Sequence, residues 1–78
     1  ANMKDILEVV IKNLVDNAEA VSITEKIDAK SVCYEVKVAK EDMGKVIGKQ
    51  GKMAKAIRSI MKAIATREHK KVNVEFLD

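Results

Sequence analysis

The chain has 78 residues, of which 47 % are hydrophobic and 35 % are charged. This length supports one small domain, residues 1–78, with the balance of a globular rather than a disordered protein. No apolar run approaches the roughly 20 residues of a membrane span, and no signal peptide pattern is present. The single cysteine, Cys33, excludes an internal disulfide and indicates a reducing cytoplasm. We expect a cytoplasmic protein without membrane contact, in which Met3 is a candidate natural start and Ala1 and Asn2 are additions from cloning.

Positive charge is concentrated in one part of the chain, although the net formal charge is only +3. Residues 1–39 carry five lysines against seven acidic residues, whereas residues 40–71 carry ten lysines and arginines against three acidic residues. A segment this basic indicates a polyanionic partner. Charge alone leaves a solvated helix face as the alternative.

The first predicted element is a helix over residues 3–16, because hydrophobic residues recur there at helical spacing. The stripe consists of Met3, Ile6, Leu7, Val10 and Leu14, and it is widened by Ile11 and Val15. It is broader than one small sheet requires. Either a subunit contact or a deep groove on the sheet would account for its width.

Two strands are predicted next, over residues 20–27 and 31–38, with the polar residues 28–30 as a short turn between them. Such a pair forms a hairpin. The second strand places Val32, Tyr34, Val36 and Val38 on one face and polar residues on the other, which predicts a sheet covered on one side only. We therefore expect Tyr34 in the core rather than stacked on a nucleic acid base, and Cys33 as a strand residue.

A short helix over residues 41–47 and a longer one over residues 52–66 are predicted on either side of Gly48 and Gly51. Glu41 and Asp42 precede the apolar residues of the short helix, where capping is their expected role. Within it, Gly44 suggests close packing.

A polar link over residues 67–71 leads to a final strand over residues 72–77. The order α-β-β-α-α-β makes this strand parallel to the second one, through a right-handed crossover. The fold class is therefore α+β, as a two-layer domain with a three-stranded mixed sheet and three helices on one face.

The stretch Gly48-Lys49-Gln50-Gly51 has the local chemistry of a phosphate-binding turn. Glycine tolerates positive φ angles, and the helix that follows begins with unpaired N–H groups that favour an anion. Lys45, Lys49 and Lys52 add charge beside the turn.

Two other nucleotide motifs are excluded. A P-loop needs four residues between its glycines and a Ser or Thr after its lysine, but three residues separate Gly44 from Gly48 and Gln50 follows Lys49. The dinucleotide fingerprint needs Gly-x-Gly directly after a strand, whereas here Val46 occupies the position of its middle glycine and a predicted helix precedes the loop.

The motif "VIGKQG" between two predicted helices resembles the signature of the KH domain, whose Gly-x-x-Gly loop clamps four nucleotides. The element order resembles the type II arrangement over essentially the whole chain, and the small stand-alone bacterial KH proteins of the KhpA type are most similar in length and motif. The resemblance implies that Gly48 and Gly51 shape the loop, that Lys49 and Gln50 face the phosphates, and that Ile47 floors an apolar groove for bases.

The resemblance also implies that the last strand lies across this groove, with the preceding link as the variable loop. Edge contacts are then expected from Arg67, His69, Lys70 and Lys71. One position departs from the pattern, because many KH domains carry an aliphatic residue three positions after the second glycine, where this chain has Ala54. The smaller side chain leaves groove depth and base preference open.

The longer helix also carries a basic stripe at spacings of three, three and four, formed by Lys52, Lys55, Arg58 and Lys62. The stripe leads away from the loop and extends a track for phosphates, or it is simply a solvated face.

No catalytic constellation is present, so we expect a protein that is not an enzyme and that has no cofactor. His69 has no partner at metal-ligand spacing, so no metal site is expected.

The expected partner is single-stranded RNA, with single-stranded DNA bound in vitro, and the resemblance implies a homodimer or a heterodimer with another KH or other RNA-binding protein. The expected role is post-transcriptional regulation or RNA chaperoning. The alternative is a protein-interaction or dimerisation subunit of a larger RNA–protein assembly, in which contact with RNA is secondary.

Overall fold

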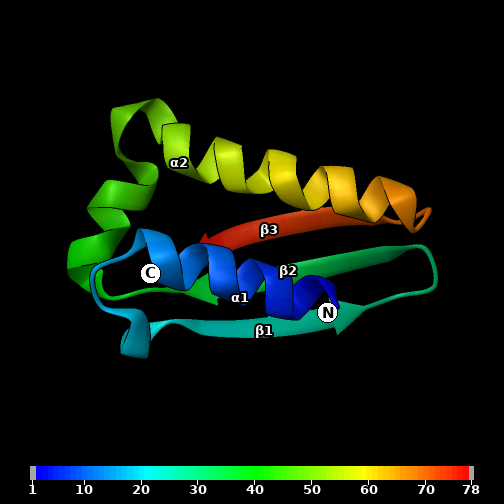
Figure 1. The fold of residues 1–78 in the computed structure, drawn as a ribbon, viewed down its shortest axis with the longest axis horizontal. Helices are drawn as coiled ribbons and strands as arrows, with labels where there is room; N and C mark the ends of the chain where they lie inside the picture. The colour runs from blue at the N-terminus through cyan, green and yellow to red at the C-terminus, as the bar shows by residue number, and fades with distance from the viewer. Residues whose placement is uncertain (1, 78) are drawn as a thin grey trace.

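In the computed structural model, which describes residues 2–77, two helices and a short 3-10 turn accompany a three-stranded sheet (Figure 1). In chain order the elements are α1 (Met3–Leu14), η1 (Ala18–Ala20), β1 (Ser22–Ile27), β2 (Ser31–Lys37), α2 (Lys40–Arg67) and β3 (Lys71–Leu77). Ala1, considered above as an addition, and Asp78 lie outside the described residues. Asn2 has a structural role, because its side chain accepts a hydrogen bond from the Asp5 N–H at 2.9 Å and caps α1.

The sheet has the strand order β1-β2-β3 and contains both kinds of pairing. β1 and β2 are antiparallel, with Ile23 opposite Val36, and they form the predicted hairpin. β3 runs parallel to β2, with Tyr34 opposite Val74, as the predicted crossover requires. The α+β class and the mixed three-stranded sheet are therefore confirmed. β2 ends at Lys37, so Val38 lies just after the strand and packs against the core from there.

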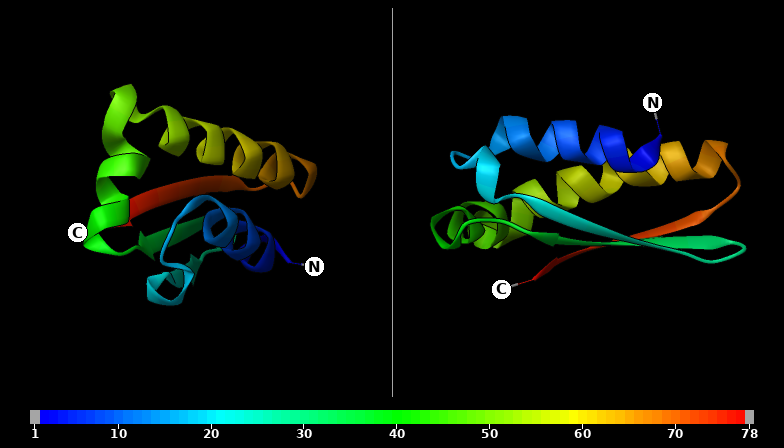
Figure 2. Two further views of the ribbon diagram at one scale, coloured as in Figure 1. Left: turned by 60° about the vertical axis from the view of Figure 1, so that its left-hand side comes forward. Right: turned by 90° about the horizontal axis from the view of Figure 1, so that it is seen from below.

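One face of the sheet is covered by α1 and the later part of α2 (Figure 2). Burial alternates along β2, where Val32, Tyr34 and Val36 are buried and their neighbours are only partly covered. The opposite face carries the polar side chains, including those of Ser31 and Glu35. Alternating hydrophobicity in the sequence thus identified the correct face.

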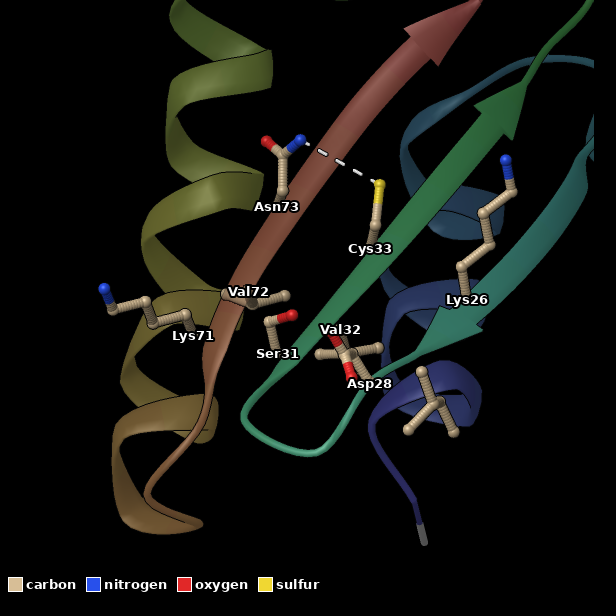
Figure 3. A pocket seen from close by; sticks show the side chains of 9 residues that line it. Lys26, Asp28, Ser31, Val32, Cys33, Lys71, Val72 and Asn73 are labelled. Atoms are coloured by element: carbon tan, nitrogen blue, oxygen red, sulfur yellow. Dashed lines mark hydrogen bonds between the residues drawn. The ribbon is translucent and has the colours of Figure 1, made fainter.

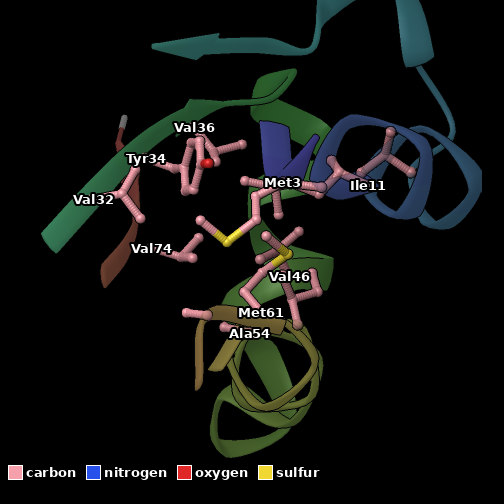
Figure 4. Packing of buried hydrophobic residues seen from close by; sticks show 13 residues of the cluster. Met3, Ile11, Val32, Tyr34, Val36, Val46, Ala54, Met61 and Val74 are labelled. Carbon is pink, nitrogen blue, oxygen red and sulfur yellow. The ribbon is translucent and has the colours of Figure 1, made fainter. Parts of the chain in front are cut away.

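The core joins the sheet to both helices (Figure 4). Leu7 and Ile11 of α1 and Ile57 and Met61 of α2 are almost fully buried. Tyr34 is 0 % exposed, which confirms its expected place in the core. Its hydroxyl donates a hydrogen bond to Glu25 Oε2 at 2.7 Å, and burial together with this carboxylate raises the pKa of Tyr34. The tyrosine is therefore neutral at physiological pH.

Four residues with non-helical backbone angles, Gly48 to Gly51, interrupt α2. They divide it into two helical segments, residues 40–47 and 52–67, which meet at a sharp change of direction (Figure 1). The structure thus contains α1 and an interrupted α2, where the sequence predicted three separate helices. The interruption directs the first segment across the end of the sheet and the second along it (Figures 1 and 2).

Candidate functional site

Three consecutive residues of the Gly48–Gly51 turn have left-handed backbone conformations. The φ angles are 53° at Lys49, 63° at Gln50 and 72° at Gly51, whereas Gly48 has an ordinary φ of −62°. A non-glycine residue in this region costs about 1–2 kcal/mol, and such strain concentrates at functional sites. The side chains of Lys49 and Gln50 are exposed. The strained backbone of the turn therefore projects two polar side chains into solvent.

The first segment of α2 is tied to the chain that follows α1 by a buried carboxylate. Asp42 is 1 % exposed, and its two oxygens accept hydrogen bonds from the N–H groups of Asp16 and Asn17, each at 3.0 Å. Lys45 adds an ion pair with Asp16 at 3.6 Å. The expectation that Asp42 caps its own helix is wrong, because the N-cap is Ala39 and Asp42 bonds to a different segment. Asp42 thereby positions the helix that precedes the turn.

The hydrogen bonds from Asp16 and Asn17 lower the pKa of Asp42, with a further contribution from the nearby charge of Lys45. A lowered pKa stabilises the fold above the unfolded-state value of about 3.9, and this stabilisation is lost as the pH falls through the folded-state value. We expect Asp42→Asn to lower the Tm at pH 7, because its amide N–H₂ would oppose a backbone N–H. The deficit relative to the parent should shrink as the pH falls below about 3.9.

Thermal unfolding followed by circular dichroism at pH 7, 5 and 3 measures this deficit. The exposed neighbour Glu41 supplies the control, and Glu41→Gln should unfold much like the parent at each pH. A deficit in Asp42→Asn that is equal at all three pH values would contradict the role given to the ionised carboxylate.

A hollow of about 440 Å³ lies beside the turn, on the side where α1 ends. Its lining combines apolar and glycine positions with three lysines: Leu14, Gly44, Lys45, Gly48, Lys49, Lys52, Met53 and Ala56. Ile47 is 51 % exposed but does not line this hollow. A Cβ atom at Gly44 would meet nothing within 4 Å, so the suggestion of close packing at this glycine is wrong. The absence of a side chain there leaves the hollow open.

The second segment of α2 separates a buried face from a basic one. Ala54, Ile57, Met61 and Ala65 are buried, and the four residues of the basic stripe are exposed. Arg58 differs from the lysines because its Nε donates a hydrogen bond to the backbone carbonyl of Val74, in β3, at 3.0 Å. Its guanidinium also lies over the ring of Phe76, 5.7 Å from the centroid. This contact between helix and strand could not be predicted from the sequence.

The remaining predicted contacts lie at the other end of the molecule. Arg67 ends α2, Lys71 begins β3, and His69 and Lys70 connect them. The 16-residue segment 52–67 spans about 24 Å along the helix axis, so the structure does not bring these four residues to the turn (Figure 1). Their contact with RNA stays a prediction.

A second hollow, of about 290 Å³, opens near the hairpin turn at the end of the sheet remote from Gly48–Gly51 (Figure 3). It includes the free thiol of Cys33, whose Sγ lies 3.9 Å from Asn73 Nδ2, and Lys26, which pairs with Glu35 at 3.3 Å. Within residues 2–77 no group of three His, Cys, Asp or Glu side chains is placed to hold a metal ion. In the same part of the chain, no helix combines the length and apolar character needed to cross a membrane.

Comparisons with known proteins identify the family of the chain. The family model described as KhpA/KhpB, KH domain matches residues 4–76. The chain belongs to this family. The RNA-binding protein KhpA of Clostridium perfringens is 52 % identical over 75 residues, which cover 96 % of this chain and 100 % of that protein.

More distant KhpA proteins match over the same length. The RNA-binding protein KhpA of Chlamydia caviae is 46 % identical over 76 residues, which cover 97 % of each chain. That of Listeria monocytogenes is 42 % identical over 76 residues, covering 97 % of this chain and 100 % of its own. No solved structure matches the chain. The Gly48–Gly51 turn falls within the region matched by the KhpA/KhpB family model.

Proposed function

We propose that this protein is a type II KH domain that binds single-stranded RNA through the Gly48–Gly51 turn. The observation that carries the proposal is the run of left-handed residues that exposes Lys49 and Gln50 at the junction of two helical segments. Its support is membership of a family whose curated relatives are named RNA-binding proteins. The KH module is described as a Gly-x-x-Gly loop that clamps four nucleotides.

The phosphates lie over the turn. Lys49 and Gln50 donate hydrogen bonds to them, and the segment that restarts at Lys52 offers the N–H groups of its first turn. Lys52 and Lys55 continue the positive surface along α2, whereas Lys45 is partly neutralised by Asp16. Bases lie against the exposed side chain of Ile47. The contacts with phosphate are made to the RNA backbone by charged and N–H groups of the protein, so they give affinity with little sequence preference.

A second RNA-binding unit is part of the proposal, because four nucleotides give only weak binding and joining two sites raises the effective concentration. Exposed apolar side chains support a protein partner: Leu14 lines the hollow beside the turn, and Ile60 lies on the same side of α2 as Met53 and Ala56. The partner is a second copy or another KH or other RNA-binding protein, in post-transcriptional regulation or RNA chaperoning. Sedimentation at micromolar concentration tests self-association. A measured mass of one chain would exclude the homodimer and leave the heterodimer as the proposed assembly.

Fluorescence anisotropy with a labelled RNA octamer tests the function itself. The single strand should bind more tightly than the same sequence in a duplex. The logarithm of the binding constant should fall with the logarithm of salt concentration with a slope of about −2 to −3, as for three or four phosphates. Absence of saturable binding, or equal binding of single strand and duplex, would contradict the proposal.

A further inference from the structure

Arg58 connects the second segment of α2 to the outer edge of the sheet. β3 pairs with β2 on one side only, and on its other side the Val74 carbonyl accepts the hydrogen bond from Arg58 Nε at 3.0 Å. Arg58 lies seven residues beyond Gly51, about 10 Å along the helix. This is close enough to the turn for a strand of four nucleotides to reach it.

The contact reverses the hydrogen-bonding character of the strand edge at this position. An open Val74 carbonyl is an acceptor, and it would select bases with exocyclic amino groups. The guanidinium of Arg58 covers it and presents donors instead, because arginine has five N–H donors and no acceptor. Within residues 2–77 the Val74 carbonyl is the one hydrogen-bond partner of the Arg58 side chain, so the four N–H donors on the Nη atoms remain available.

The guanidinium is also restricted at two points. It lies over the Phe76 ring, with its Cζ 5.7 Å from the centroid, and its Nε donates to the Val74 carbonyl. A planar pair of donors matches two neighbouring acceptors on one base edge, which is how arginine recognises guanine O6 and N7. Cytosine offers such a pair at O2 and N3. Adenine and uracil alternate donors with acceptors along their edges.

From this geometry we infer that Arg58 sets the base preference of the RNA site, and that it favours a base with two neighbouring acceptors, guanine or cytosine, over adenine and uracil. The inference rests on the proposed function and deepens it, because the turn supplies affinity for phosphates and Arg58 supplies selectivity. It also gives Arg58 a role different from that of Lys55 and Lys62 on the same stripe, which are exposed side chains without such a contact to β3.

The test uses four labelled RNA octamers of uridine with A, C, G or U at one central position. The parent should bind the G or the C octamer about tenfold more tightly than the A octamer. Comparing the G octamer with the C octamer then shows which of the two bases Arg58 prefers. Arg58→Lys keeps the charge but loses the planar fork, so it should reduce this ratio to about twofold or less with little change in the salt dependence. Arg58→Gln is a second variant, and thermal unfolding by circular dichroism confirms that both are folded.

A purely structural role for Arg58 would change affinity for all four octamers equally. A parent with no base preference, or a preference that survives in both variants, would overturn the inference. Failure of the proposed function has a different signature, because a double variant, Lys49→Asp with Gln50→Asp, would then bind RNA as the parent does. If that variant loses binding while the Arg58 variants keep the base ratio, the inference alone is wrong.

Discussion

Replacing Lys49 and Gln50 together with aspartate should weaken the binding of single-stranded RNA by about 100-fold. The change removes the two donors that we propose face phosphate, and it adds two negative charges. Hydrogen bonds to charged groups contribute about 1.5–3 kcal/mol each, so losing two corresponds to at least this factor. The fold should survive, because both side chains are exposed and aspartate is among the residues that tolerate left-handed backbone.

The matched control is Ala29→Asp with Lys30→Asp, in the exposed turn between β1 and β2. It alters the net charge by the same amount at the other end of the molecule. Anisotropy titrations of the parent and both double variants separate a local contact from a general loss of positive charge. Equal weakening in the two variants would mean that RNA responds to net charge and that the turn is not the binding site.

The second large effect is expected on stability, from Leu7→Ala. Leu7 is 0 % exposed, and it packs α1 into the core formed by the sheet and α2. Truncating a buried leucine costs about 2–5 kcal/mol, which is a large part of the 5–15 kcal/mol that stabilises a typical domain. At about 4–8 °C per kcal/mol for a chain of this size, the Tm should fall by roughly 8–40 °C. Thermal unfolding followed by circular dichroism measures this change.

Val9→Ala is the control on the same helix, because Val9 is 60 % exposed. It should change the free energy of unfolding by no more than about 0.5 kcal/mol. Similar losses in both variants would contradict the placement of α1, since a helix that uses a different face would bury Val9 in place of Leu7.

The sheet could be predicted from the sequence because its strands and hairpin turn are indicated by patterns among neighbouring residues. The alternation of Val32, Tyr34 and Val36 with polar residues indicates one buried face, and the turn at residues 28–30 predicts the hairpin. The crossover to β3 follows from general rules on chain connections. The end of β2 was misplaced by one residue, because Val38 continues the alternating pattern but packs on the core from outside the strand.

The turn was located correctly, but its conformation differs from the expectation based on glycine alone. Gly51 has the positive φ angle for which glycine is suited, whereas Gly48 is extended. Lys49 and Gln50 adopt the left-handed region without being glycines. Local propensity disfavours this conformation, so it could not be predicted from the residue types.

The two most informative polar contacts of the site could also not be predicted from the sequence. Asp42 bonds to residues 25 and 26 positions earlier, and Arg58 bonds to a residue 16 positions later. Contacts between residues so far apart in the chain leave no periodic pattern in the sequence from which they could be predicted. The helix cap predicted for Asp42 is wrong. The phosphate contact predicted for Arg58 stays a prediction, and its hydrogen bond to Val74 is an additional contact that the sequence does not predict.

The most direct measurement of the central claim is a titration of ¹⁵N-labelled protein with single-stranded RNA, followed through the backbone amide signals. Binding of phosphate by the turn predicts that the largest shifts occur at residues 48–52, with smaller shifts along the exposed side of α2 near Arg58. Amides of the open face, such as those of Ser31 and Glu35, should barely move. Largest shifts on that face, with residues 48–52 unchanged, would contradict the assignment of the Gly48–Gly51 turn as the RNA-binding site.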